Sequence, residues 1–330
     1  MMQLAAETKS PRNKFNIAFR RNLLRWYHAH RRELPWRASR DPYHIWISEI
    51  MLQQTRVNAV LEHYRRFLTQ FPTVGALAEA PLETVLAAWS GLGYYRRARM
   101  LHEAAKKVVD EHKAEFPSSA AELQALPGIG RYTAAAIASM AFDEPVAVVD
   151  GNVERVVCRV LGRAVSQQET WQTAQSWLPQ QHPGDFNQAM MELGAIVCTP
   201  RAPQCLLCPI TSLCATRGEG VAAKKASRQN KRDISYGFAS RLGQIWLVQR
   251  PATSSLMPGM WELPEVSANQ NDSKSICTVR HSITTTDYTV SVVELVVRRT
   301  MKGSWVSHSK LNAIPLTGLA RKILKKLNVL

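Results

Sequence analysis

The chain changes its hydrophobic period once, and that change restricts the folds open to it. From about residue 13 to residue 214, apolar residues recur at the three- and four-residue spacing of amphipathic helices, beginning with a run from Phe15 to Trp26. Beyond residue 233, β-branched and alternating runs predominate, and a short amphipathic stretch follows them. We therefore expect a mainly α protein, with a helical domain over residues 1–214 and a smaller α/β domain over residues 233–330.

Further helices are expected over residues 43–57, over residues 81–90 with a stop at Gly91, and over residues 96–116. In the second domain we expect strands in QIWLVQR, TTDYTVSVVELVVRR and GSWVSH, and a helix in LARKILKKL. Residues 215–232 include six Lys or Arg residues and almost no large apolar side chains, which predicts a flexible basic linker.

The charge balance is strongly basic. Forty-two Lys and Arg residues face twenty-six Asp and Glu residues, a formal net charge of +16 with a pI near 9.9. Such an excess indicates a polyanionic partner, most often nucleic acid, although a basic ribosome-associated or merely soluble protein would share it. We find no apolar run of secretory or bilayer-spanning length, so we expect a cytoplasmic protein with reduced thiols and no membrane partner.

Four cysteines crowd into one short segment. They are Cys198, Cys205, Cys208 and Cys214, with six, two and five residues between them. In a reducing compartment this spacing predicts a metal centre rather than disulfides. All-thiolate ligation suits one [4Fe–4S] cluster; zinc is the alternative, less favoured because only one close Cys pair is present. Cys158 and Cys277 are expected to be core residues.

The run LPGIG, with Gly128 and Gly130, stands just ahead of an alanine-rich helix. Glycines let the backbone turn sharply and approach another molecule, and the unpaired N–H groups at the start of a helix attract anions. Together with the preceding SAAELQAL, residues 118–142 predict a helix–hairpin–helix that grips a DNA phosphate without reading sequence. A glycine-rich helical turn with nothing bound is the alternative.

The order of these motifs resembles the helix–hairpin–helix DNA glycosylase superfamily with an iron–sulfur loop. The hairpin is followed by VVDGNVERVVCRV and then by the cysteines; PWR, SEIMLQQT, GLGYYRRAR and FNQAMMELGA are similar to its adenine DNA glycosylase branch, the MutY family. The resemblance covers residues 20–214. It implies a two-lobed helical domain with an iron–sulfur loop at residues 198–214. It also implies a monomeric DNA N-glycosylase that removes adenine paired with 8-oxoguanine or guanine in duplex DNA.

Breaking the bond between a purine and deoxyribose needs an acid for the leaving base and an anion beside the cationic sugar. Glu49 suits the acid, because apolar neighbours on its helix should raise its pKa; a surface Glu is the alternative. Asp150 suits the anion, with an N-cap as its alternative. The resemblance implies that Glu49 protonates adenine and that Asp150 faces the sugar, assisted by Asn152. It also implies that Tyr132 hydrogen-bonds near both carboxylates.

Residue 132 separates two branches of the superfamily. In the branch of endonuclease III this position is Lys, whose amine attacks the sugar and forms a Schiff base. A phenol cannot form an imine, so Tyr132 predicts an enzyme that leaves an abasic site without cutting the strand. The alternatives are an endonuclease III-like glycosylase/lyase for oxidised pyrimidines and a non-catalytic iron–sulfur DNA-binding protein.

The resemblance further implies residues that read DNA. Gln54 and Tyr94 would wedge into the duplex, Thr55 and Leu92 would contact the guanine, and Arg37 would line the adenine pocket. A packing role is the alternative for each of the five.

Residues 233–330 stand where adenine DNA glycosylases carry a Nudix-like domain that recognises 8-oxoguanine. LMPGMWELPEV (256–266) and VRHSIT (279–284) are similar to stretches of that domain, but no acidic Nudix box is present, so nucleotide hydrolysis is not expected. The sequence departs from the family at TTTDY (284–288) and at PLTG (315–318). Thr317 would still donate a hydrogen bond to a lesion; a simple DNA clamp is the alternative.

Overall fold

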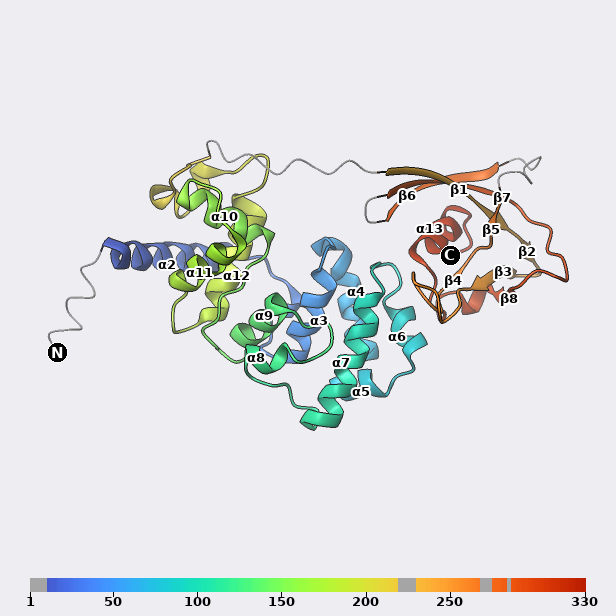
Figure 1. Cartoon of the computed structure of the whole chain (residues 1–330), viewed down its shortest axis with the longest axis horizontal. Coiled ribbons are helices and arrows are strands. Elements are labelled where there is room, and N and C mark those ends of the chain that lie inside the picture. Colours follow the sequence, from blue (N-terminus) through green and yellow to red (C-terminus); the bar gives the residue numbers. More distant parts are fainter. Residues whose placement is uncertain (1–10, 219–229, 268–274, 284–285) are drawn as a thin grey trace. The chain divides into compact units, whose positions relative to one another are not determined.

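The structure is a computed structural model that describes residues 11–218, 230–267, 275–283 and 286–330 (Figure 1). The chain forms two compact units. The first unit consists of Met1–Gln54 and Lys107–Lys224, and the second of Thr55–Lys106 and Lys225–Leu330. The domain bounds expected from the sequence stay a prediction, and residues 219–229 of the expected linker lie outside the described residues.

The first unit is helical, as expected. Its helices are α2 (Pro11–His30), α3 (Pro42–Leu52), α8 (Ala120–Leu123), α9 (Arg131–Ala141), α10 (Gly151–Leu161), α11 (Gln167–Trp177) and α12 (Pro183–Glu192), with short turns η1 (Pro35–Arg37), η2 (Leu193–Val197), η3 (Cys205–Leu207) and η4 (Thr211–Leu213). Helix α2 packs against α11 and α12 (Figure 1). Its apolar side chains Phe19, Leu23 and Tyr27 are buried in the core of the unit. The apolar face of α2 therefore contributes to the core of this unit.

Two expected helices end earlier than predicted. The helix expected over residues 43–57 ends at Leu52, and Gln54 has a φ of 56°, which no right-handed helix accommodates. The helix expected over residues 96–116 is α7 (Arg96–His112). Lys113 and Ala114 follow it at φ values of 54° and 63°, so the helix ends before Pro117 can break it.

The helix–hairpin–helix segment forms as expected from α8, a tight turn and α9. The side chain of Ser119 caps α8 by accepting a hydrogen bond from the Glu122 amide. Gly128 has a φ of 73°, a left-handed value that a residue with a Cβ adopts only with strain. Gly130 is the N-cap of α9, and a Cβ there would meet nothing within 4 Å, so this glycine leaves the helix start open.

In the second unit, residues 55–106 supply the helices α4 (Val57–Gln70), α5 (Val74–Glu79), α6 (Leu82–Ala88) and the first turns of α7. Residues 230–330 form a small α/β region, which confirms the expected change of period. Its elements are β1 (Asn230–Phe238), β2 (Ser240–Arg241), β3 (Gln244–Gln249), β4 (Trp261–Glu262), β5 (Glu265–Val266), β6 (Ser275–Ile283), β7 (Thr286–Glu294), β8 (Ser304–Ser307), the turn η6 (His308–Lys310) and α13 (Gly318–Lys326).

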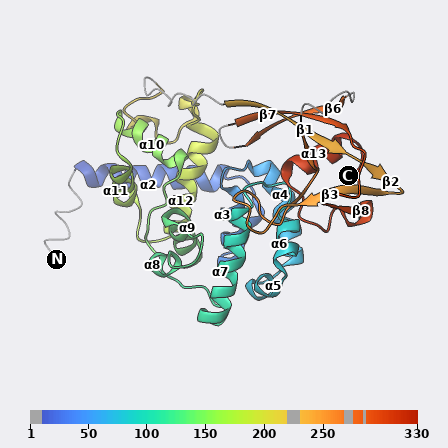
Figure 2. The ribbon, with the colours of Figure 1, turned by 45° about the vertical axis from the view of Figure 1, so that its right-hand side comes forward.

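Within the described residues, the strands form two sheets. One has the order β5-β1-β7-β6, with β1 parallel to β7 and the other pairs antiparallel; in the other, β3 pairs with β2, β4 and β8. Helix α13 packs against β6 (Figure 2). It also contacts β4. The expected strands β3, β7 and β8 are confirmed, whereas β1 gave no signal because it opens with the exposed polar run NKRD.

Candidate active site

The Glu49 side chain projects from the last turn of α3, a helix that begins at Pro42 with the side chain of Asp41 as its cap. Glu49 is 6% exposed, so its side chain is largely removed from water. Burial raises the pKa of Glu49 to about 7. The hydrogen bond from Tyr132 and the charge of Arg37 act against this shift, and the charge of Asp150 adds to it. About half of the protein molecules therefore carry a protonated Glu49 near neutral pH, and a general acid requires such a proton.

Tyr132 stands in the first turn of α9, and its hydroxyl donates a hydrogen bond to Oε2 of Glu49 at 2.7 Å. The two residues are 83 positions apart, and the packing of α3 on α9 brings them together. Burial, followed by the charge of Glu49, raises the pKa of Tyr132 well above its usual value. Tyr132 thus remains a neutral donor at physiological pH, beside the acid.

Asp150 is the N-cap of α10. Its Oδ1 accepts hydrogen bonds from the backbone amides of Asn152 and Val153 at 2.9 and 2.8 Å, and its Oδ2 accepts one from Nδ2 of Asn152 at 2.8 Å. The N-cap alternative is therefore confirmed, but it does not exclude a role as the anion. The start of a helix favours negative charge, so the same contacts that cap α10 hold an ionised carboxylate in place.

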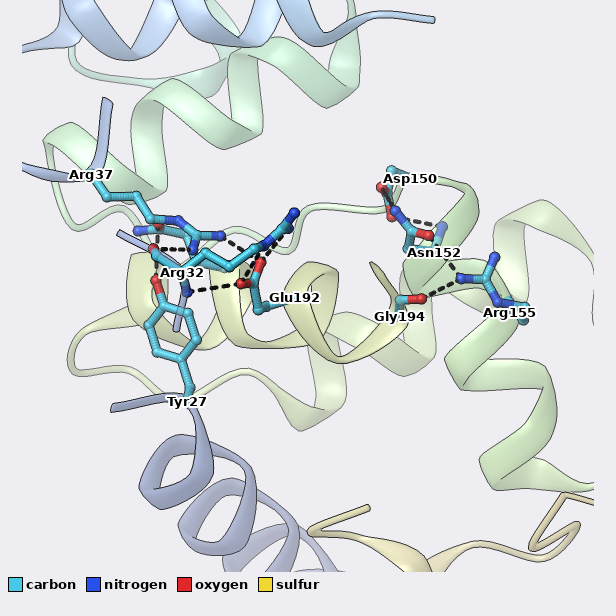
Figure 3. Close-up of polar contacts among 9 residues, drawn as sticks. Tyr27, Arg32, Arg37, Asp150, Asn152, Arg155, Glu192 and Gly194 are labelled. Atoms are coloured by element: carbon cyan, nitrogen blue, oxygen red, sulfur yellow. Dashed lines mark hydrogen bonds and ion pairs between the residues drawn. The ribbon is translucent and has the colours of Figure 1, made fainter. Parts of the chain in front are cut away.

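Arg155 connects Asn152 to the segment after α12 (Figure 3). Its guanidinium donates to Oδ1 of Asn152 at 2.7 Å, to the carbonyl of Gly194 at 2.7 Å and to the carbonyl of Cys198 at 2.8 Å. Asn152 is thus held on one side by Arg155 and on the other by Asp150. The sequence pattern gave no indication of Arg155, because an Arg in the first turns of a helix is usually solvated.

A second buried carboxylate, Glu192, lies at the end of α12 and is 1% exposed. Figure 3 shows the guanidinium groups of Arg32 and Arg37 pointing toward it, with distances to Oε2 of 2.7 and 2.9 Å. Burial acts to raise the pKa of Glu192, but the hydrogen bonds from Arg32 and Arg37 outweigh it and lower this pKa to about 2. Glu49 and Glu192 are thus two buried carboxyls whose pKa values are displaced in opposite directions, a pattern typical of acid–base sites.

Arg37, expected to line the adenine pocket, is held in this ion pair and lies 5.6 Å above the ring of Tyr27. The sequence pattern assigned no role to Glu192. The sequence could nevertheless have indicated that Glu192 is buried. It is a lone carboxylate within the apolar run AMMELGA, as Glu49 is within ISEIML.

The remaining residues expected to read DNA differ in exposure. Tyr94 is 47% exposed and has a φ of 48°, while Leu92 is 6% exposed. Gln54 is exposed and Thr55 half-buried. Thr317 is 1% exposed and caps α13 by accepting from the amide of Ala320 at 3.2 Å, so its hydroxyl already has a structural partner. Their contacts with DNA stay a prediction.

The four cysteines line one cavity of the first unit. Its wall also includes apolar side chains of α10 and η2 and the guanidinium of Arg159, which donates to Sγ of Cys198 at 3.3 Å. Burial raises the pKa of the Cys208 thiol to about 11. Four soft sulfur donors gathered at one cavity fit the chemistry of a site completed by a cationic metal.

Among the described residues, no group of three or more His, Cys, Asp or Glu side chains is arranged around a single metal ion. The four thiols that line one cavity are a donor set that suits a [4Fe–4S] cluster, and four cysteines can also bind zinc.

Comparisons with known proteins place these features in a family. Residues 47–180 match the family described as HhH-GPD superfamily base excision DNA repair protein. The adenine DNA glycosylase of Rattus norvegicus is 42% identical over 315 residues, covering 76% of this chain and 60% of that protein. The adenine DNA glycosylase of Buchnera aphidicola subsp. Baizongia pistaciae is 39% identical over 223 residues, covering 66% of this chain and 64% of that protein.

Solved structures agree at the level of the fold. A thermostable thymine-DNA glycosylase has a TM-score of 0.58 at 32% identity, and the match covers 62% of this chain and 96% of that one. A trapped endonuclease III–DNA covalent intermediate has a TM-score of 0.53 at 27% identity, covering 60% of this chain and 93% of that one. No helix in the described part of the chain is long and apolar enough to cross a membrane.

The fold and the site thus define a protein of the helix–hairpin–helix base excision repair superfamily. Within that superfamily, the curated relatives from rat and Buchnera to which the chain is similar are named adenine DNA glycosylase. The chain spans about 60% of the length of the rat relative.

Proposed function

We propose that this protein is a monofunctional DNA N-glycosylase that releases adenine paired with 8-oxoguanine or guanine in duplex DNA. The observation that carries the proposal is the buried Glu49 carboxyl with a pKa of about 7, hydrogen-bonded to Tyr132 at 2.7 Å and influenced by the charge of Asp150. An acid poised near neutral pH beside a fixed anion is the pair of groups that a purine leaving group and a cationic sugar require.

The reaction follows from these two environments. Once the target nucleotide leaves the stack, Glu49 donates its proton to a ring nitrogen of adenine, and the bond between C1′ and the base breaks with its electron pair on the base. Asp150, fixed by the two amides and by Asn152, stabilises the positive charge on the sugar. A water molecule then adds its oxygen to C1′ and gives a proton to the Glu49 carboxylate, which restores the acid.

The α/β region of residues 230–330 is proposed to be the Nudix-like part that recognises 8-oxoguanine opposite the adenine. The support is the run LMPGMWELPEV, of which Trp261 and Glu262 form β4. Two of the residues in which this chain departs from the family, Thr284 and Thr285, lie outside the described residues.

We also propose that Cys198, Cys205, Cys208 and Cys214 hold one [4Fe–4S] cluster, since all four line one cavity. A bound cluster would cross-link the loop through four thiolates and supply one-electron chemistry there. We further propose that the protein acts in the cytoplasm as a monomer.

A glycosylase/lyase for oxidised pyrimidines is the principal alternative, because a structural neighbour is a covalent endonuclease III–DNA intermediate. A lyase needs an amine beside the sugar, and the residue that contacts Glu49 here is a phenol. Failure of borohydride to trap a protein–DNA adduct supports the monofunctional enzyme, and trapping contradicts it.

The first test is Glu49→Gln. Because the amide keeps the shape of the side chain and an acceptor for Tyr132 but carries no transferable proton, we expect adenine release to fall by about 10²-fold or more, with duplex affinity changed less than about threefold. The measurement is single-turnover release from duplexes with adenine opposite 8-oxoguanine or guanine, and a thymine glycol duplex is the control. Normal release by Glu49→Gln would remove Glu49 from the role of acid.

A further inference from the structure

The guanidinium of Arg97 lies at the centre of the second unit's Gly91–Tyr95 turn. It lies between two aromatic rings, with its carbon 5.4 Å from the centroid of Trp89 and 5.5 Å from that of Tyr94. Cations over aromatic faces are attracted by the ring electrons, most strongly where water is excluded. One charged group is thus in contact with a buried ring, Trp89, and with a half-exposed one, Tyr94.

The same guanidinium is bonded to the backbone of the turn. Its Nη2 donates to the carbonyls of Leu92 and Gly93, both at 3.2 Å, and to Oγ1 of Thr55 at 3.4 Å. The indole of Trp89 donates to the Gly93 carbonyl as well, at 3.1 Å. Arg97 therefore contacts three of the residues expected to meet DNA, two through hydrogen bonds and one through its ring.

The turn needs such support because its backbone is strained. Gly91 and Gly93 have φ values of 108° and 70°, and Tyr94, which has a Cβ, has a φ of 48°. A left-handed non-glycine residue persists only where its surroundings hold it there. Burial lowers the pKa of Arg97 to about 10, so the group remains charged at neutral pH.

We propose that Arg97 is a positioning residue that fixes Tyr94 as a rigid wedge and links it to Thr55, so that DNA meets both in one preformed arrangement. This inference rests on the proposed function. Rigid groups insert between bases at a lower entropic cost than mobile ones, so the preformed turn should speed extrusion of the target base. Lysine cannot replace Arg97, because a single ammonium lacks the planar fork that stacks on two rings while donating to several carbonyls.

A double-mutant cycle tests the link. Arg97→Lys, Tyr94→Ala and the double variant are compared in single-turnover adenine release from a duplex with adenine opposite 8-oxoguanine. We expect Arg97→Lys to slow release about tenfold in the native background and less than about twofold beside Tyr94→Ala, since coupled residues are not additive. The matched control is Arg96→Lys, at the exposed neighbouring position, with an unchanged rate.

Equal losses in both backgrounds would overturn the proposal, because Arg97 would then act on stability alone. Melting midpoints of all variants are measured alongside, and a rate loss that merely follows the midpoint counts against the proposal. If Arg97→Lys does not fold, Thr55→Val tests the same link, because it removes one acceptor of the guanidinium. Additive effects of Thr55→Val and Tyr94→Ala on the rate of release would equally contradict the proposal.

Failure of the proposed function is distinguishable from failure of this inference. If the wild-type protein releases no adenine, the proposed function is contradicted, but the role of Arg97 in positioning Tyr94 can still be measured. The same cycle is then measured as affinity for a duplex with a tetrahydrofuran abasic analogue opposite 8-oxoguanine. The coupling between Arg97 and Tyr94 is expected there too, and its absence would refute the positioning role.

Discussion

Glu49 and Glu192 are the same residue type, both are nearly inaccessible to water, and yet their pKa values are displaced in opposite directions. The difference lies in the partners. Two guanidinium groups hold Glu192 ionised, while Glu49 has a single phenol donor and feels the negative charge of Asp150. Burial alone favours the neutral form of a carboxyl, and at Glu192 the hydrogen bonds and charge of two guanidinium groups reverse this effect.

The raised pKa of Glu49 has a consequence for stability. Between the unfolded value near 4.5 and the folded value of about 7, the folded protein binds more protons than the unfolded chain, so its free energy of unfolding falls as pH rises through this window. We expect Glu49→Gln to be more stable than wild type at pH 8, by up to about 3 kcal/mol, with little difference near pH 4. Melting midpoints at both values check this.

The exposed Glu103→Gln is the control and should show no such pH dependence.

In the wild-type protein the rate of adenine release should decline above about pH 7, as Glu49 loses its proton. A rate that stays level to pH 9 would mean that another group is the acid.

At the scale of elements, the site depends on where helices begin and end. Asp150 lies at the start of α10 as its N-cap, and Glu49 is buried because α3 packs along α9. The π-helical turn η2 brings Gly194 against Asn152, where a Cβ on Gly194 would lie 2.6 Å from Cβ of Asn152 and 3.0 Å from its carbonyl oxygen. Only glycine permits this approach.

Gly194→Ala should therefore displace the start of α10 and, with it, Asp150. We expect adenine release to fall by about 10- to 100-fold, because small misplacements of reacting groups are costly, with a stability loss of about 1–3 kcal/mol. Gly75→Ala is the control, since a Cβ there meets only Oγ1 of Thr73 at 3.8 Å, an ordinary contact. Single-turnover rates and melting midpoints measure both effects; an unchanged rate in Gly194→Ala contradicts the expectation.

The cysteine loop provides a further prediction for an element. The purified protein should contain about four irons per chain and absorb visible light, and Cys208→Ser should lose most of both together with stability. Cys158→Ser is the matched control, because Cys158 is a half-buried cysteine of α10 outside the cavity wall. Elemental analysis decides the matter: a stoichiometric zinc ion in place of iron would refute the cluster.

At the scale of the whole molecule, the charge of +16 governs binding that does not depend on sequence. Each neutralised phosphate releases counterions, so affinity for DNA falls steeply as salt increases. Raising sodium chloride from about 50 to about 200 mM should weaken binding to an undamaged duplex by on the order of 10³-fold if about six phosphates are contacted. Fluorescence anisotropy measures this, the melting midpoint over the same range is the control, and a flat salt response contradicts it.

Local signals in the sequence predicted most of the fold. The helical period of α2, the N-cap at Asp150, the glycine turn at Gly128 and the alternation in β3 all depend on residues within a few positions of one another. The predictions were wrong where an element begins or ends without a residue that is typical of such a boundary. Nothing in the run from Leu52 to Gln54 indicates a break as a proline would, and β1 begins among charged side chains.

The sequence by itself determined which chemical groups are available: a carboxyl within an apolar helix, a phenol in place of an amine, four clustered thiols and a surplus of cations. Only the tertiary structure decided how those groups behave. The contact between Glu49 and Tyr132, the ion pairs of Glu192 and the guanidinium of Arg97 between two rings all depend on packing. The pKa and geometry of a side chain are set by the neighbours that folding places around it, and a linear pattern specifies those neighbours only when they are close in the chain.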